Sequence, residues 1–146
     1  MKIFTIGFTK KSAATFFGLL QMHNMDALLD IRLKPNSQLA GYAKQRDLKY
    51  FLKEICAAEY QHHLDLAPSE ETFSQFRSDK NWDSLQQSYL AEIEERKIAT
   101  TLDQQLFSEK NTVLLCSEHK PDKCHRRLLA EYLQQQWPDV EIVHLF

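Results

Sequence analysis

Short apolar runs alternate along the chain with longer stretches whose apolar residues have helical spacing. Residues 2–6, 27–31 and 112–116 are apolar runs of strand length, and glycine or polar residues follow each of them. Residues 60–64 and 140–144 are predicted as two further strands, the first of them short. Near-continuous apolar runs are typical of strands that are buried on both faces of a parallel sheet.

The alternation of strands with helices predicts an α/β fold. We expect a Rossmann-like three-layer sandwich, with a mostly parallel sheet of about five strands and helices on both faces. The length of 146 residues suits one domain that covers residues 1–146. The predicted helices span residues 12–24 with Ser12 as N-cap, 45–57, a segment from Ser69 with Phe73 and Phe76 inward, 82–107 with a break near Arg96 and Lys97, and 123–137.

Composition narrows the class of protein. The chain is 43% hydrophobic, enough for a core, and its net charge of −2 argues against a surface built throughout for nucleic acid. Three cysteines, an odd number, argue against a disulfide framework and for a reducing, cytoplasmic compartment. No signal-peptide pattern is visible, and no apolar stretch reaches the roughly 18 residues that span a bilayer. We therefore expect a soluble protein without a membrane partner.

Three loops with unusual side chains follow predicted strands, at residues 7–11, 30–37 and 116–127. Ligands of open α/β sheets bind at the carboxyl ends of the strands, where these loops would meet. The helix that begins near Cys124 adds unpaired N–H groups and partial positive charge, although Asp122 is placed to cap it and would compete with a ligand. We expect a cationic edge that binds a small anion, a phosphate or a nucleotide. Its basic residues are Lys10, Lys11, Arg32, Lys34, Lys120, Lys123, Arg126 and Arg127.

The segment around the last two cysteines concentrates the reactive side chains. Cys124, at a helix N-terminus beside a histidine and an arginine, has the environment that lowers a thiol pKa, so it is the candidate nucleophile. Cys116 could share that role, and Glu118 or His119 would act as general acid or base. Six residues after Cys116 stands Asp122, so the Cys-x5-Arg loop of cysteine phosphatases and rhodanese-like enzymes is absent. That mechanism is not expected.

The same hypothesis assigns an anion-binding set. Arg32 and Arg126 would hold the anion in bidentate fashion, and Asp30 would orient an arginine or a substrate hydroxyl. The reaction would be that of a hydrolase or transferase acting on a phosphorylated or nucleotide-like substrate. The candidates for anion binding are Arg32, Arg126, His125, Asp30 and Lys10.

Other interpretations of these residues stay open. The chain could be a non-catalytic nucleic-acid or nucleotide binding module that uses the same edge. The cysteines could be core residues, and the arginines could be paired with carboxylates. Such pairs would join Arg32 to Asp30, Arg126 to Glu118 and Arg127 to Glu131.

A metal site is a third hypothesis, and its ligand types suit zinc. Cys124 and His125, however, would point about 100° apart as adjacent helical residues, which makes them poor joint ligands. We therefore predict no metal and no other cofactor. The candidate ligands would be Cys116, Glu118, His119, Cys124 and His125.

Four segments together match the motifs of a known family. They are residues 5–9, Asp30-Ile31-Arg32 with Pro35 and Ser37, residues 64–69 with Trp82 and Tyr89, and Cys116-Ser117-Glu118 with Cys124-His125-Arg126. The last is the most specific, because a cysteine and a glutamate at this distance from Cys-His-Arg are rare by chance. On these motifs the chain resembles the family called domain of unknown function 488, over nearly its whole length. The resemblance implies a compact bacterial or archaeal α/β domain with no established reaction. Phe8 stands where the family usually has a histidine, so an activity that needs this histidine is not implied.

Overall fold

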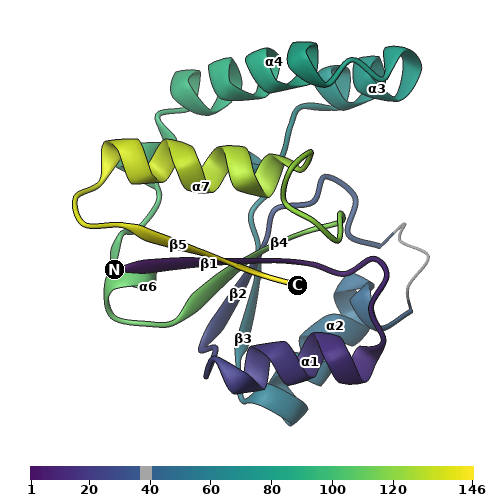
Figure 1. Ribbon diagram of the computed structural model, residues 1–146, viewed down its shortest axis with the longest axis vertical. Helices are drawn as coiled ribbons and strands as arrows, with labels where there is room; N and C mark the ends of the chain where they lie inside the picture. Colours follow the sequence, from purple (N-terminus) through teal and green to yellow (C-terminus); the bar gives the residue numbers. More distant parts are fainter. Residues whose placement is uncertain (37–40) are drawn as a thin grey trace.

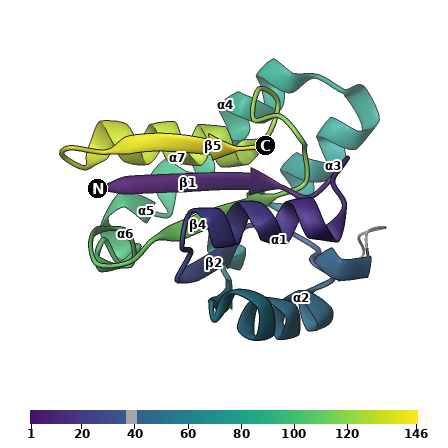
Figure 2. The same ribbon diagram turned by 60° about the horizontal axis from the view of Figure 1, so that its bottom comes forward.

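The strands of the computed structural model, which describes residues 1–36 and 41–146, form one parallel sheet. Within these residues five strands are ordered β3–β2–β4–β1–β5, and every neighbouring pair is parallel (Figures 1 and 2). The predicted α/β fold is confirmed. Ser37, part of the second-loop motif, lies outside the described residues. The strands are β1 (Lys2–Gly7), β2 (Ala27–Asp30), β3 (Glu59–His62), β4 (Thr112–Cys116) and β5 (Glu141–Leu145).

Helices cover both faces of this sheet (Figure 1). On one face lie α1 (Ala13–Met22) and α2 (Gln45–Phe51), and α2 continues as a π-helical turn, Leu52–Cys56. On the other face lies α7 (His125–Gln136), with α4 (Trp82–Glu95) packed outside it. The remaining helical segments are α3 (Glu70–Asp79), α5 (Ile98–Thr101), α6 (Gln105–Ser108) and the 3-10 turns Gly41–Ala43 and Leu64–Leu66.

Two hydrophobic cores lie on the two sides of the sheet, and successive strand residues alternate between them. Ile3 and Leu114 pack with α4 and α7, whereas Phe4 and Val113 pack with α1 and α2. Because the inner strands are buried on both faces, their sequences are apolar without interruption. The edge strand β3 is only half-buried, which explains its weaker sequence signal.

Local signals set the ends of several helices. Ser12 caps α1 as predicted, because its side-chain oxygen accepts from Thr15 N at 3.1 Å. Lys97 adopts a left-handed conformation with φ of 55° and separates α4 from α5, which confirms the predicted break. The prediction for Asp122 was wrong. Cys124 is the N-cap of α7, and no side chain makes a capping hydrogen bond there.

The connections that leave the carboxyl ends of the strands go to opposite faces of the sheet. The chain passes from β1 to α1 and from β2 toward α2 on one face, whereas it passes from β4 to α7 on the other (Figure 1). Such a reversal opens a crevice at the carboxyl ends of the strands, the usual ligand site of open α/β sheets. Among the described residues, none of the helices combines the length and the apolar composition that crossing a membrane requires.

Candidate functional site

The loops that follow β1 and β4 lie against each other at this edge. Thr9 N and Thr9 Oγ1 both donate to the carbonyl oxygen of Ser117, at 3.1 and 2.9 Å. Gly7 permits the approach, because a Cβ atom built on it would lie 1.6 Å from the carbonyl oxygen of Glu118. Glycine is therefore required here for lack of space and not for its backbone torsion, since its φ is not positive.

Asp30 and Arg32 form a buried bidentate ion pair just after β2. Arg32 Nε donates to Asp30 Oδ1 at 2.8 Å, and Arg32 Nη2 donates to Oδ2 at 2.7 Å. Tyr60 Oη donates to the same Oδ2 at 2.5 Å, and burial, followed by this hydrogen bond to Asp30, raises the pKa of Tyr60. Asp30 is fully buried, so its carboxylate orients Arg32 and does not meet a ligand directly. The pairing of Arg32 with Asp30 is confirmed.

Arg126 holds the β4–α7 loop from within. Its side chain is fully buried. Nη1 donates to the carbonyl oxygen of Glu118 at 2.5 Å and Nη2 to that of His119 at 3.2 Å, while Nε donates to Thr5 Oγ1 at 3.3 Å. Arg126 thus binds the backbone carbonyl of Glu118 and not its carboxylate, so the predicted ion pair between the two was wrong. The predicted pair of Arg127 and Glu131 is present at 3.1 Å.

Cys116, Cys124 and His125 come together at the end of β4. One ligand atom from each lies within 4.8 Å of the others. Cys116 Sγ is 3.2 Å from His125 Nδ1, and His125 Nε2 is 2.8 Å from the carbonyl oxygen of Ile31. The expected 100° divergence of Cys124 and His125 does not occur, because Cys124 has extended backbone angles (φ −138°, ψ 139°) and precedes the helix. The geometric objection to joint ligands was therefore wrong.

The two thiols differ in acidity. Burial acts to raise the pKa of Cys116, but its hydrogen bond with Cys124 and the charge of Arg126 outweigh burial, so this pKa is lowered. Burial, and then the contact with Cys116, raises the pKa of Cys124 well above its ordinary value. Both side chains are buried in the core beside α7, as the core interpretation predicted. The lowered pKa of Cys116 favours its thiolate, whereas the raised pKa of Cys124 disfavours the ionised form that a nucleophile needs.

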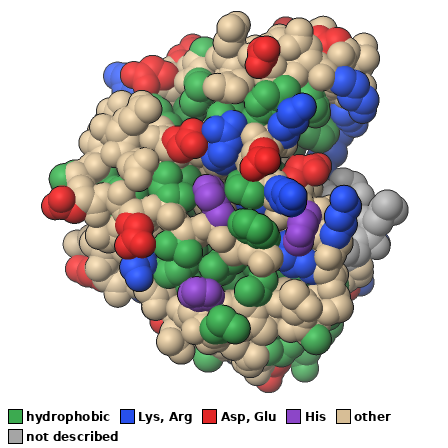
Figure 3. Space-filling view, in the orientation of Figure 1, with side chains coloured by type: hydrophobic (Ala, Val, Ile, Leu, Met, Phe, Trp, Pro, Cys, Tyr) green, Lys and Arg blue, Asp and Glu red, His purple; other side chains and the backbone are tan. Residues whose placement is uncertain are grey.

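A cavity of about 350 Å³ opens between this edge and the α3–α4 pair. Of the predicted site residues, Arg32, Cys116, Glu118, Cys124 and His125 line it, whereas the buried Asp30 and Arg126 lie behind the wall. Lys10 borders a neighbouring hollow of about 370 Å³, which shares Glu118 and Lys123 with the first. Figure 3 shows Lys, Arg, Asp, Glu and His side chains gathered on the right of the molecule, where the β4–α7 loop lies in Figure 1.

Sequence reasoning missed the outer wall of this cavity. Phe73, Phe76, Arg77 and Lys80 at α3, with Trp82 at the start of α4, line it from the side opposite the strands. Phe73 and Phe76 were expected to point into the core, but they are only half-buried. The spacing of Arg77 and Lys80, one helical turn apart beside aromatic residues, was the signal available in the sequence.

His119 lies outside the thiol cluster, in the neighbouring hollow. Its Nδ1 is 2.9 Å from Lys11 Nζ, which can only donate, so the ring accepts at this nitrogen. Burial, followed by the charges of Lys11 and Lys10, lowers the pKa of His119. The structure therefore does not bring this candidate acid or base to the sulfur atoms.

Comparison with models of protein families gives a match over most of the chain. The model of the family described as domain of unknown function DUF488 matches residues 12–133. No curated protein and no solved structure gives a significant match to the chain. The matched range includes the ion pair after β2, the α3–α4 wall and the thiol cluster.

Proposed function

Because the chain belongs to the DUF488 family, whose function is unknown, we propose its ligand from the site: a small phosphorylated or nucleotide-like molecule bound in the cavity beneath α3 and α4. The observation that carries this proposal is one atom, Arg32 Nη1. It is buried and finds no hydrogen-bond partner among the described residues.

The remaining contacts of Arg32 explain why this atom points to an anion. Asp30 occupies Nε and Nη2, and the guanidinium is fixed further by the ring of Phe8, whose centroid is 5.3 Å from Arg32 Cζ. Leaving a buried charged donor unsatisfied costs about 1–3 kcal/mol or more. An oxygen of a phosphate or carboxylate in the cavity that Arg32 lines would remove this cost.

The charges around the cavity favour the same ligand. Lys34, Arg77, Lys80 and Lys123 line it together with Arg32, and Glu118 is the acidic residue among its lining residues. Glu70, which lies nearby, is 3.3 Å from Lys34 and 3.5 Å from Arg77 and balances part of this charge. The excess of positive charge raises the local concentration of anions.

The aromatic side of the cavity suits a ligand that carries a ring. Phe73, Phe76 and Trp82 line the cavity on the side opposite the strands, where Arg77 Cζ lies 5.1 Å from the centroid of the Phe73 ring. The rings of Phe76 and Trp82 pack edge to face at 6.3 Å between centroids. Ligand sites combine such apolar walls with a few polar groups that fix orientation. A nucleotide presents both parts, a base for the rings and a phosphate for the guanidinium and ammonium groups.

Isothermal titration with inorganic phosphate and with adenosine monophosphate tests the proposal. The double variant Arg77→Gln, Lys80→Gln should weaken binding about tenfold or more, and added salt should weaken the wild type. The matched control is Lys110→Gln, since Lys110 also pairs with a carboxylate, Glu59, but lies at the amino ends of the strands. Its affinity should equal that of the wild type.

Two results would overturn the proposal. One is no binding of either probe at millimolar concentration by the folded wild type. The other is tighter, salt-dependent binding of a single-stranded oligonucleotide than of the mononucleotide, because that result would favour the nucleic-acid binding module instead.

A further inference from the structure

Cys116, Cys124 and His125 have the chemistry and the spacing of a metal site, and we propose that they bind a thiophilic divalent cation, with zinc as the natural ion. Their ligand atoms lie within 4.8 Å of one another. A tetrahedral zinc ion with bonds of about 2.3 Å to sulfur and 2.0 Å to nitrogen separates its ligands by roughly 3.5–3.8 Å. The separations in the structure, from 3.2 Å between Cys116 Sγ and His125 Nδ1 to at most 4.8 Å, bracket that spacing, so small side-chain shifts suffice.

The hydrogen bond of His125 prepares the ring for this role. The carbonyl oxygen of Ile31 can only accept, so the nitrogen 2.8 Å from it, Nε2, carries the proton. The lone pair of Nδ1 then points to Cys116 Sγ at 3.2 Å. Histidine ligands commonly donate their other N–H to a backbone carbonyl, which fixes the tautomer and the ring orientation.

The protein around the cluster can balance the charge of two thiolates. Arg126, two residues after Cys124, carries a fully buried guanidinium, a positive charge that acts on both thiols. Two thiolates and a neutral imidazole around a divalent cation give a site with no net charge. All three residues also line the cavity, so a fourth coordination position would open toward it, as in sites that keep one position for water or ligand.

Cobalt titration of the reduced, chelator-treated chain tests the site. One equivalent of Co²⁺ should produce thiolate-to-cobalt absorption in the near ultraviolet and the visible bands of a tetrahedral ion, and Zn²⁺ should abolish both. Cys116→Ser and Cys124→Ser should each halve the thiolate absorption and weaken binding roughly 100-fold. The matched control is Cys56→Ser, because Cys56 is the third free cysteine and lies on the other side of the sheet. It should behave as the wild type.

Each remaining outcome decides against the site. The proposal fails if the reduced wild type shows no thiolate absorption with Co²⁺, or if Cys56→Ser loses as much as the other two variants. It also fails if the chain as purified carries a Cys116–Cys124 disulfide and, once reduced, does not bind Co²⁺. Thermal unfolding of the metal-free variants identifies any that do not fold, and Zn²⁺ should raise the melting temperature of the wild type and of Cys56→Ser.

Metal binding does not depend on the proposed anion site. Arg77 and Lys80 line the cavity from α3, opposite the strands, and neither belongs to the thiol cluster. The Arg77→Gln, Lys80→Gln variant should therefore lose phosphate affinity and keep its Co²⁺ spectrum. Failure of one proposal leaves the other intact.

Discussion

Substitution of Gly7 by alanine should damage the site more than any single change of a polar residue on its surface. The added Cβ would lie 1.6 Å from the carbonyl oxygen of Glu118 and 2.9 Å from Arg126 Nη1, whereas real Cβ atoms essentially never approach within 3.0 Å. The β4–α7 loop must therefore retreat by at least 1.4 Å, the difference between 3.0 and 1.6 Å. The two nearest obstructing atoms, O and C of Glu118, are backbone, so a rotamer change cannot relieve the clash.

The cost follows from the hydrogen bonds that this movement breaks. The bond from Arg126 Nη1 to Glu118 involves a charged, buried donor and is worth about 1.5–3 kcal/mol. The two bonds from Thr9 to the neighbouring carbonyl of Ser117 add about 1 kcal/mol each. The reduced entropy of the unfolded alanine chain offsets about 0.4–1 kcal/mol. We expect a net loss of about 3–4 kcal/mol from the free energy of unfolding.

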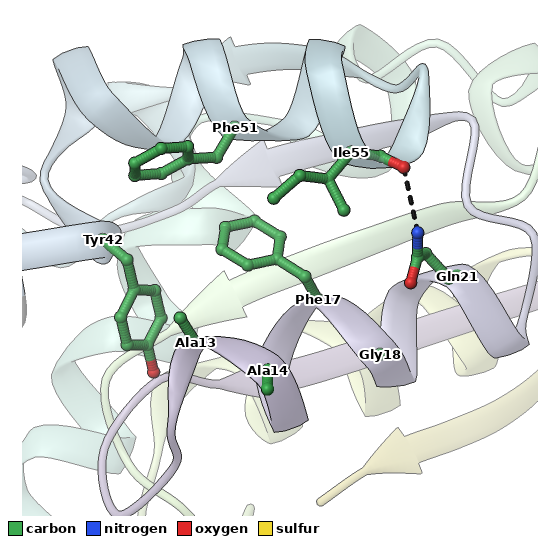
Figure 4. A pocket seen from close by; sticks show the side chains of 8 residues that line it. All are labelled: Ala13, Ala14, Phe17, Gly18, Gln21, Tyr42, Phe51 and Ile55. Carbon is green, nitrogen blue, oxygen red and sulfur yellow. Dashed lines mark hydrogen bonds between the residues drawn. The ribbon is translucent and has the colours of Figure 1, made fainter.

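Urea denaturation followed by circular dichroism measures this loss. Gly18→Ala is the matched control, because a Cβ at Gly18 meets nothing within 4 Å and lies inside α1. Figure 4 shows Gly18 on α1 beside an open apolar pocket, next to Gln21, whose Nε2 donates to the carbonyl oxygen of Ile55 at 3.0 Å. Alanine there should stabilise the protein by about 0.5–1 kcal/mol. A loss below 1 kcal/mol for Gly7→Ala, with the cobalt spectrum unchanged, would refute the reasoning.

Two further predictions concern single contacts of the site. Tyr60→Phe removes the hydrogen bond to the buried carboxylate of Asp30 and should lower the free energy of unfolding by about 1.5–3 kcal/mol in urea, and a loss under 0.5 kcal/mol would contradict it. The imidazole of His119 should titrate by NMR below its ordinary value of 6.5, and Lys11→Met should raise its pKa, because burial and the Lys11 charge disfavour the imidazolium. Because the pKa of His119 is lower in the folded chain, the unfolded chain binds more protons, so the stability contributed by His119 should fall as the pH drops from 6.5 through the folded-state pKa. An unchanged pKa of His119 in Lys11→Met would show that the Lys11 charge does not lower it.

The sequence predicted the inner part of the fold because local pattern determines it. The buried strand β4 was predicted with its observed bounds, and the end of α4 followed from the phase slip at Arg96 and Lys97. Side-chain periodicity records which faces are apolar, but it does not record which distant element covers them. The strand order β3–β2–β4–β1–β5 and the position of α3 and α4 over the site are long-range facts of this kind.

The candidate site was likewise predicted where local pattern determines it and missed where distant contacts do. The parallel sheet brought Arg32, Cys116 and Cys124 to one edge, as expected from the rule that parallel strands share their carboxyl end. Sequence could not show that Arg126 turns inward to backbone carbonyls, because an arginine in the first turn of a helix has the same pattern whether it faces a ligand or a carbonyl. The sequence also placed Cys124 inside the helix, and that shift of two residues in the helix start removed a ligand geometry that the structure contains.

Phe8 connects the family resemblance to the chemistry of the cavity. The family resemblance implies a histidine at this position. The phenyl ring of Phe8 lies against the Arg32 guanidinium instead, with 5.3 Å between Cζ and the ring centroid. A neutral imidazole there could accept a hydrogen bond from Arg32 Nη1, whereas a phenyl ring attracts the cation but offers no lone pair. Phenylalanine therefore holds the guanidinium in place and leaves Nη1 without a partner among the described residues. Residue 8 of this chain therefore carries no titratable group, while Arg32 Nη1 beside it stays a buried donor held in a fixed position.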